Sequence, residues 1–89
     1  MERWRLIVSG RVQGVGYRQA CCQRAQDLGL GGWVRNRPDG RVELEVEGCS
    51  QKLEQLRIWC ESGPAAAQVS SVNESVIPLA GQDWFEVRH

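Results

Sequence analysis

The segment best suited to chemistry is Gly10–Arg18, which reads Gly-Arg-Val-Gln-Gly-Val-Gly-Tyr-Arg. Its three glycines allow the backbone to curl so that successive N–H groups converge on one point. A helix is expected to follow, and its N-terminus also favours negative charge. Arg18 falls in the first turn of that helix, where a cation is locally unfavourable unless an anion lies between them. The segment therefore predicts an anion-binding loop with Arg18 as its cation.

This segment differs from the common phosphate loops. It lacks the Gly-Lys-Ser/Thr of a Walker A loop, and Gln19 stands where G-x-G-x-x-G needs its third glycine. Val12 stands where the loop of cysteine phosphatases has its cysteine. The simpler alternative is a glycine-rich connection followed by an exposed arginine. Three glycines together with an arginine in an unusual position favour the anion site over that alternative.

Asn36 is the second candidate, because it ends an expected strand at 33–37, just before a Pro-Asp-Gly turn at 38–40. In a right-handed split βαβ unit the first two strands run the same way, with the third strand between them. Their C-terminal ends then share one edge of the sheet, roughly 10 Å apart. Asn36 could therefore reach an anion held by the loop, while Arg35 and Arg37 are expected to give electrostatic support at most.

The elements that must position these residues follow from the spacing of apolar side chains. Alternation predicts strands, a spacing of three to four predicts helices, and Ser50 is the expected N-cap of the second helix. The segment 69–76 is expected to form one strand with a bulge or two short pieces. The expected elements are strand 3–9, helix 17–28, strands 33–37 and 42–47, helix 50–62, strand 69–76 and strand 84–88.

This order, β-α-β-β-α-β with a terminal strand, predicts an α+β ferredoxin-like sandwich. Two helices cover one face of an antiparallel sheet, and residues 1–89 form a single domain, since 89 residues provide one core. Glu43, Glu45 and Glu47 alternate with apolar residues, so they are expected to form a solvated acidic face and not a metal site.

Composition limits the classes of function. The formal net charge is zero, which disfavours a nucleic-acid binder held by bulk charge. The first 41 residues nevertheless hold eight arginines against three acids, which favours a local anionic ligand near them. No signal sequence or apolar run of membrane-spanning length is present. Cys21, Cys22, Cys49 and Cys60 have no zinc spacing and are expected to be reduced packing residues of a cytoplasmic protein.

Four parts of the chain together resemble the two signatures of the acylphosphatases. They are Gly10–Arg18, the segment Gly-Trp-Val-Arg-Asn at 32–36, Asp39-Gly40 with Val42, and Gly48. The resemblance extends over nearly the whole chain, including Ser62-Gly63-Pro64, and is nearest to the small bacterial-type members. It implies the ferredoxin-like fold and hydrolysis of the carboxyl-phosphate bond of acyl phosphates. It also implies that this hydrolysis uses no metal, cofactor or covalent intermediate.

The resemblance also implies the roles of the site residues. Arg18 binds the phosphoryl group together with backbone amides of the loop, and Asn36 orients the attacking water. The loop residues concerned are Gln13, Gly14, Val15, Gly16, Tyr17 and Arg18. The expected partner is a small acyl phosphate, and the protein is expected to be a monomer that binds neither nucleic acid nor a membrane.

Two other classes stay open on the residues alone. The chain could be a binding module that holds an anion without turnover. It could also bind RNA on the same fold, although no RNP motif with its aromatic residues is present. The group that orients Arg18 is also open, and the candidates are the α-carboxylate of His89, Asp83 and Glu86.

Overall fold

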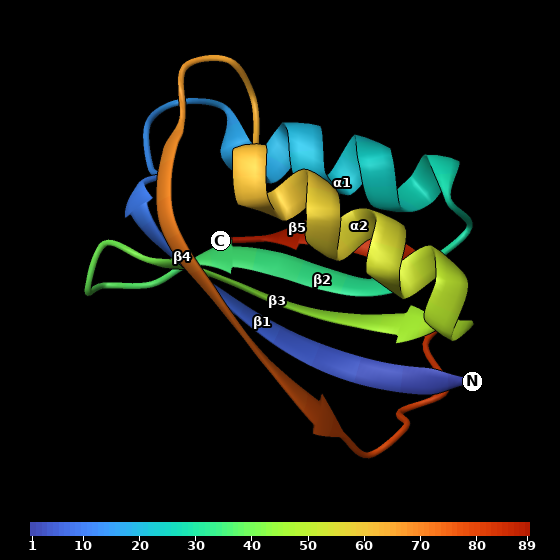
Figure 1. Cartoon of the computed structure of the whole chain (residues 1–89). Coiled ribbons are helices and arrows are strands. Elements are labelled where there is room, and N and C mark those ends of the chain that lie inside the picture. The colour runs from blue at the N-terminus through green and yellow to red at the C-terminus, as the bar shows by residue number, and fades with distance from the viewer.

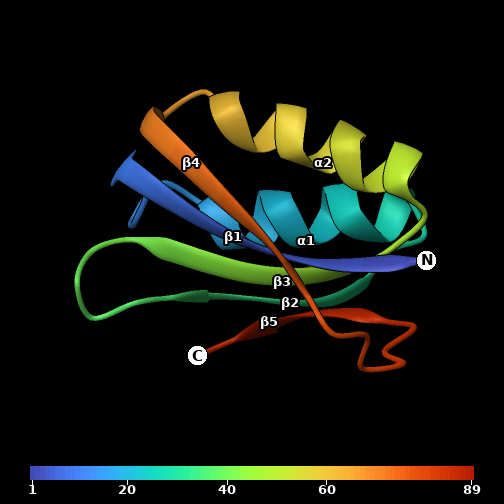
Figure 2. The ribbon, with the colours of Figure 1, turned by 60° about the horizontal axis from the view of Figure 1, so that its bottom comes forward.

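The structure is a computed structural model that describes all 89 residues, and it confirms the β-α-β-β-α-β order with a terminal strand. The sheet has the strand order β4-β1-β3-β2-β5. Neighbouring strands are antiparallel except β2 and β5, which are parallel, so the sheet is mixed at that edge. Both helices cover the same face of the sheet (Figures 1 and 2). The elements are β1 (Glu2–Arg11), α1 (Tyr17–Asp27), β2 (Gly31–Asn36), β3 (Val42–Gly48), α2 (Ser50–Ser62), β4 (Gln68–Ile77) and β5 (Phe85–Arg88).

The core lies between the sheet and the two helices, where strand alternation and helical spacing turn apolar side chains toward one another. Leu6 of β1 lies opposite Leu44 of β3, and both are fully buried. The helices contribute Cys21 and Ala25 from α1 and Leu53, Leu56 and Cys60 from α2, which recur at the spacing of three to four residues that brings side chains to one face of a helix. No helix of the chain has the length and apolar character needed to cross a membrane.

Strand β1 is longer than predicted, because β4 continues to pair with it past residue 9. Gly10 lies opposite Val69 and Arg11 opposite Gln68, after a shift of register between Ser9 and Gly10. The segment 68–77 is therefore one strand with a bulge, one of the two arrangements expected for it. Gly10 has a φ of 122°, and a Cβ there would lie 2.2 Å from the Gln68 carbonyl oxygen, so the close strand pairing requires glycine. The connecting loop is reduced to Val12–Gly16.

The N-cap of α2 is Cys49, so the prediction of Ser50 was wrong by one residue. Cys49 has extended backbone angles, and its carbonyl accepts hydrogen bonds from the N–H groups of Lys52 and Leu53. Its side chain makes no capping hydrogen bond. The stronger capping propensity of serine is overridden here because β3 runs through Gly48 and leaves Cys49 as the first residue free to turn.

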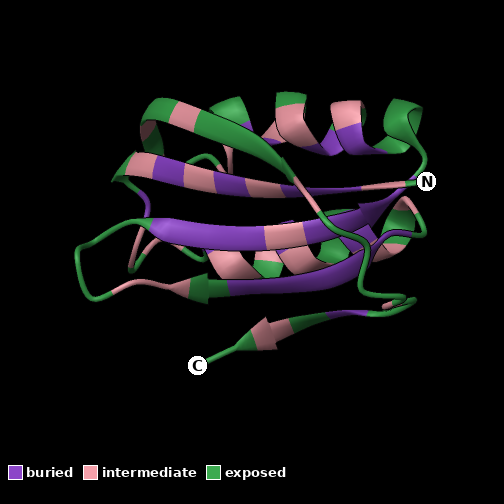
Figure 3. Cartoon of the chain, turned by 90° about the horizontal axis from the view of Figure 1, so that it is seen from below, coloured by how far each residue is buried: buried purple, intermediate pink, exposed green.

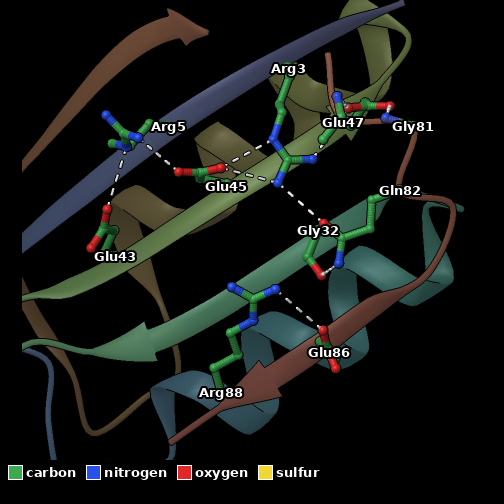
Figure 4. Close-up of polar contacts among 11 residues, drawn as sticks. Arg3, Arg5, Gly32, Glu43, Glu45, Glu47, Gly81, Gln82, Glu86 and Arg88 are labelled. Carbon is green, nitrogen blue, oxygen red and sulfur yellow. Dashed lines mark hydrogen bonds and ion pairs between the residues drawn. The ribbon is translucent and has the colours of Figure 1, made fainter. Parts of the chain in front are cut away.

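The prediction that the glutamates of β3 form a solvated face was wrong. Figure 3 shows the face of the sheet away from the helices, with β2 and β3 mostly buried and β4 mostly exposed. Glu47 is buried, and the guanidinium of Arg3 donates to Glu47 at 3.2 Å and to Glu45 at 3.1 Å (Figure 4). The three glutamates do share one face of β3, as the alternation predicts, but the arginines on the neighbouring strands convert that face into a layer of ion pairs.

The same layer extends across three strands, because the register places arginines directly opposite the glutamates. Arg5 lies opposite Glu45 and donates to it at 2.8 Å. Arg35 of β2 lies opposite Glu43 and donates to it at 2.7 Å. The positive first part of the chain is therefore partly neutralised by the acids of β3, which composition alone does not show.

The segment between β4 and β5 covers one end of this layer. The N–H groups of Ala80 and Gly81 donate to the Glu47 carboxylate at 2.8 and 3.0 Å. The side-chain amide of Gln82 accepts from Arg3 at 3.2 Å and donates to the Gly32 carbonyl at 3.0 Å (Figure 4). The buried ion pairs therefore fix the route by which the chain reaches β5.

Acid should weaken the fold through Glu47. The N–H of Ala80, together with the Arg3 guanidinium, lowers the pKa of this carboxyl below its ordinary value. A carboxyl whose pKa is lower in the folded chain than in the unfolded chain stabilises the fold at any pH above the unfolded pKa of about 4.3. That stabilisation is lost as the pH falls through the pKa of the folded chain. We expect Glu47→Gln to be less stable than wild type to urea at pH 7, with a difference that shrinks toward pH 3.

Glu61→Gln is the matched control, because Glu61 is exposed at the end of α2 and its ion pair with Arg57 lies at the surface. It should change the free energy of unfolding little at any pH. A Glu47→Gln deficit that stays constant from pH 7 to pH 3 would show that the charge of Glu47 contributes nothing to the fold.

Candidate functional site

The loop between β1 and α1 has the backbone shape that anion binding requires. Gly14 and Gly16 have φ values of 73° and 78°, in the left-handed region that other residues seldom adopt. A Cβ at either position would meet nothing within 4 Å, so these glycines are needed for conformation and not for space. Gly16 is also the N-cap of α1. The loop therefore leads directly into α1, and its backbone N–H groups can converge on one point.

These N–H groups have no carbonyl acceptor within the chain. None of the four N–H groups of Gln13–Gly16 donates to a backbone carbonyl. The N–H groups of Tyr17 and Arg18 belong to the first turn of α1, where a helix supplies no acceptor. The first bond of the helix runs from the Ala20 N–H to the Gly16 carbonyl at 3.1 Å. Six consecutive donors are thus available to an anion at the positive end of α1.

The Arg18 guanidinium is held by the end of the chain. Its Nη1 atom lies 3.4 Å from the Arg88 carbonyl oxygen and 3.2 Å from Nδ1 of the His89 ring. The acids considered as its partners, Asp83 and Glu86, make no contact with it, and Glu86 lies 3.7 Å from Arg88 instead. The chain end does lie against Arg18, but through a carbonyl and a ring nitrogen. No carboxylate neutralises the charge of Arg18, so it is available to an anion.

Asn36 is the last residue of β2, and its side chain lies on the face of the sheet that the helices cover. Val34 is fully buried in the core, and alternation places Asn36 on the same side two residues later. Its neighbour across the sheet is the buried Val42. The Oδ1 atom of Asn36 is buried and has no hydrogen-bond partner within the chain. A buried acceptor without a partner is costly, so this atom is a feature to be explained by function.

These residues meet at one edge of the sheet. The end of β1, the loop, the end of β2 and the C-terminus lie together at the left of Figure 1, opposite the N-terminus. Arg35 pairs with Arg88 across the parallel strands β2 and β5, so the group that holds Arg18 is the immediate neighbour of the end of β2. The loop and Asn36 are therefore on adjacent parts of one surface, as strand topology predicts.

The flanking arginines are less available than Arg18. Arg35 lies on the face away from the helices, where it pairs with Glu43 and lies 5.9 Å from the centre of the Trp33 ring. Arg37 pairs with Asp39 in the hairpin at 3.1 Å. The Arg35 side chain thus lies on the opposite face of the sheet from Asn36, and the Arg37 guanidinium is already paired within the hairpin.

The two cysteines of α1 lie near the loop but are poor nucleophiles. Contact with Cys60 and burial raise the pKa of the Cys21 thiol well above its ordinary value. Burial also raises the pKa of Cys22, whose Sγ lies 3.7 Å from the Phe85 carbonyl oxygen. A raised pKa keeps a thiol protonated at neutral pH, whereas the thiolate is the reactive form. All four cysteines of the chain are free thiols.

Other features lie apart from this edge. No three histidine, cysteine, aspartate or glutamate side chains gather where they could share a metal ion. A pocket of about 360 Å³ lies at the opposite edge of the sheet, where Gly31, Gly48 and the first turn of α2 meet. It contains none of the predicted site residues. The candidate site is therefore an open surface at the sheet edge and not an enclosed cavity.

Comparison with known proteins gives a consistent result. The family model described as Acylphosphatase matches residues 4–87. An acylphosphatase from Synechococcus sp. strain WH7803 is 63% identical over 87 residues, which cover 98% of this chain and 87% of that protein. One from Cupriavidus metallidurans is 65% identical over 71 residues, covering 80% of this chain and 75% of that protein. The crystal structure of acylphosphatase from Bacillus subtilis is 36% identical, covers both chains fully and superposes with a TM-score of 0.97.

Proposed function

Since this chain belongs to the acylphosphatase family and is a hydrolase of acyl phosphates, we propose that a water oriented by Asn36 attacks the phosphorus directly. In this proposal Arg18 and the loop amides hold the phosphoryl group while the carboxylate leaves. The observation that carries it is the set of six consecutive N–H donors beside an arginine that no carboxylate neutralises.

The chemistry suits these few groups. A carboxylate is a good leaving group and needs little help from an acid. Charge in the transition state of phosphoryl transfer is spread over the equatorial oxygens, so positioning and electrostatics can supply most of the catalysis. The planar guanidinium of Arg18 can bind two of these oxygens, and the amides of Gln13 to Arg18 are preorganised donors.

The role of Asn36 follows from its unpartnered oxygen. In this proposal the unpartnered side-chain amide of Asn36 hydrogen-bonds the water and so fixes the direction of its lone pair. An amide cannot remove the proton of that water. In this proposal the proton passes to an oxygen of the transferred phosphoryl group, so that the products are a carboxylate and inorganic phosphate.

The proposal also describes the form of the active protein. It is a monomer of one domain, residues 1–89, that acts on a free acyl phosphate in the cytoplasm. Four free thiols are consistent with a reducing compartment. Nucleic acid is not a partner in this proposal. The sheet face on which related folds stack RNA bases carries ion pairs here, including those of Arg3 and Glu45.

Turnover of benzoyl phosphate by the purified chain tests this function. We expect release of benzoate and inorganic phosphate, with inorganic phosphate as a competitive inhibitor. A chain that binds phosphate but leaves benzoyl phosphate intact would instead be a binding module. Binding of RNA that weakens steeply with salt, without turnover, would favour the nucleic-acid alternative.

Chelation should leave the activity unchanged. Arg18 and the helix N-terminus supply the positive potential that a divalent ion provides in many phosphoryl-transfer enzymes. We expect the rate of benzoyl phosphate hydrolysis in excess EDTA to stay within about two-fold of the untreated rate. Loss of activity in EDTA that magnesium restores would contradict the proposed mechanism.

A further inference from the structure

The side chain of Gln13 connects the loop between β1 and α1 to the hairpin that follows Asn36. The sequence predicts a role only for the backbone N–H of this residue. Its Nε2 atom donates to the Arg37 carbonyl at 2.8 Å and to the Arg41 carbonyl at 2.9 Å. Both acceptors belong to the hairpin between β2 and β3. One amide group thus uses both of its N–H bonds on a segment at least 24 residues away in the sequence.

The two carbonyls are rigid anchor points. The Arg37 N–H donates to the Arg41 carbonyl at 2.8 Å and closes the hairpin, while the Arg37 carbonyl accepts from the Gly40 N–H at 3.2 Å. The Asp39 carboxylate accepts from the Arg41 N–H at 3.0 Å inside the same turn. Gln13 therefore binds a turn that is already fixed by its own hydrogen bonds, and Arg37 follows Asn36 directly in the chain.

We propose that the Gln13 side chain is a positioning residue that sets the distance between the loop-held phosphoryl group and the water on Asn36. The proposal rests on the proposed function. None of the N–H groups of Gln13–Gly16 donates to a backbone carbonyl, so the two hydrogen bonds of the Gln13 side chain supply a support that the loop backbone lacks. A misplacement of about 1 Å between reacting groups can cost about 10²-fold in rate.

The Gln13→Met variant removes both hydrogen bonds and keeps the length of the side chain. We expect kcat for benzoyl phosphate to fall roughly 10- to 100-fold. The inhibition constant of inorganic phosphate should stay within about two-fold of wild type, because Arg18 lies on α1 against the chain end and is unaltered by this substitution. Gln51→Met is the matched control, since Gln51 is exposed on α2, and it should leave both quantities unchanged.

A double-mutant cycle separates positioning from general structural damage. If Gln13 acts through Asn36, then Gln13→Met should lower kcat by less than about two-fold in the Asn36→Ala background. Equal losses in the two backgrounds would overturn the proposal. A wild-type chain without any acyl-phosphate turnover would instead refute the proposed function, so the two failures are distinct.

A second variant, Gln13→Glu, tests the proposal even if the activity of the double mutant is too low to measure. In Gln13→Glu the new carboxylate faces two carbonyl oxygens when ionised, but it can donate one hydrogen bond when protonated. We expect its kcat, relative to wild type at the same pH, to rise as the pH is lowered through the titration of the new carboxyl. A ratio to wild type that does not change with pH would contradict the positioning role.

Discussion

Replacing Arg18 with alanine should lower kcat/KM for benzoyl phosphate by about 10²-fold or more and should also weaken inhibition by inorganic phosphate. Both effects have one cause. The guanidinium of Arg18 has no carboxylate partner, and in the proposed mechanism ground state and transition state both place phosphate oxygens against it. Steady-state kinetics with phosphate as the inhibitor measure both quantities.

Arg24→Ala is the control for a general loss of positive charge, because Arg24 is exposed in the last turn of the same helix. It should leave kcat/KM within about two-fold of wild type. An Arg18→Ala variant with unchanged kinetics would remove the basis for assigning the anion site to this loop. Arg18→Lys should recover part of the phosphate binding and less of kcat, since an ammonium lacks the planar two-point geometry.

Replacing Asn36 with alanine should separate turnover from binding. We expect kcat to fall on the order of 10²- to 10³-fold, since the water is no longer oriented. Inhibition by inorganic phosphate should stay within about two-fold of wild type, because the loop and Arg18 are unaltered. The variant should fold at least as stably as wild type, since it removes a buried oxygen without a hydrogen-bond partner.

Asn73→Ala is the matched control, because Asn73 is exposed on β4 at the far edge of the sheet. It should leave kcat unchanged. If Asn36→Ala abolishes inhibition by phosphate together with turnover, then Asn36 binds the phosphoryl group, and the division of roles between Asn36 and Arg18 is wrong.

The sequence was sufficient to predict the order of elements and the edge of the sheet where the β1–α1 loop and the end of β2 lie together. Apolar periodicity identifies which side of each strand and helix is buried, and the handedness of the βαβ unit then fixes which strand ends share an edge. Gly14 and Gly16 could be assigned to the loop because glycine is the residue that adopts a positive φ without strain. Local rules of this kind need no knowledge of distant contacts.

The misjudged features depend on contacts between distant parts of the chain. The alternation of β3 says that Glu43, Glu45 and Glu47 share a face, but only the register with β1 and β2 reveals the arginines opposite them. The chain end was a predicted partner of Arg18, but no sequence pattern identifies the groups that make the contact, the Arg88 carbonyl and the His89 ring, which lie 70 and 71 positions away. The Gln13 side chain likewise reaches carbonyl groups, which every residue has, so its target could not be identified from residue types.

In the proposed mechanism water attacks the phosphorus atom and not the carbonyl carbon. The measurement that tests it most directly is hydrolysis of benzoyl phosphate by the wild-type chain in ¹⁸O-labelled water, with both products analysed by mass spectrometry. Attack on a phosphoryl group held by Arg18 and the loop amides predicts one ¹⁸O atom in inorganic phosphate and none in benzoate. The label in benzoate would contradict the account, because the bond cleaved would then be the one between the acyl carbon and oxygen.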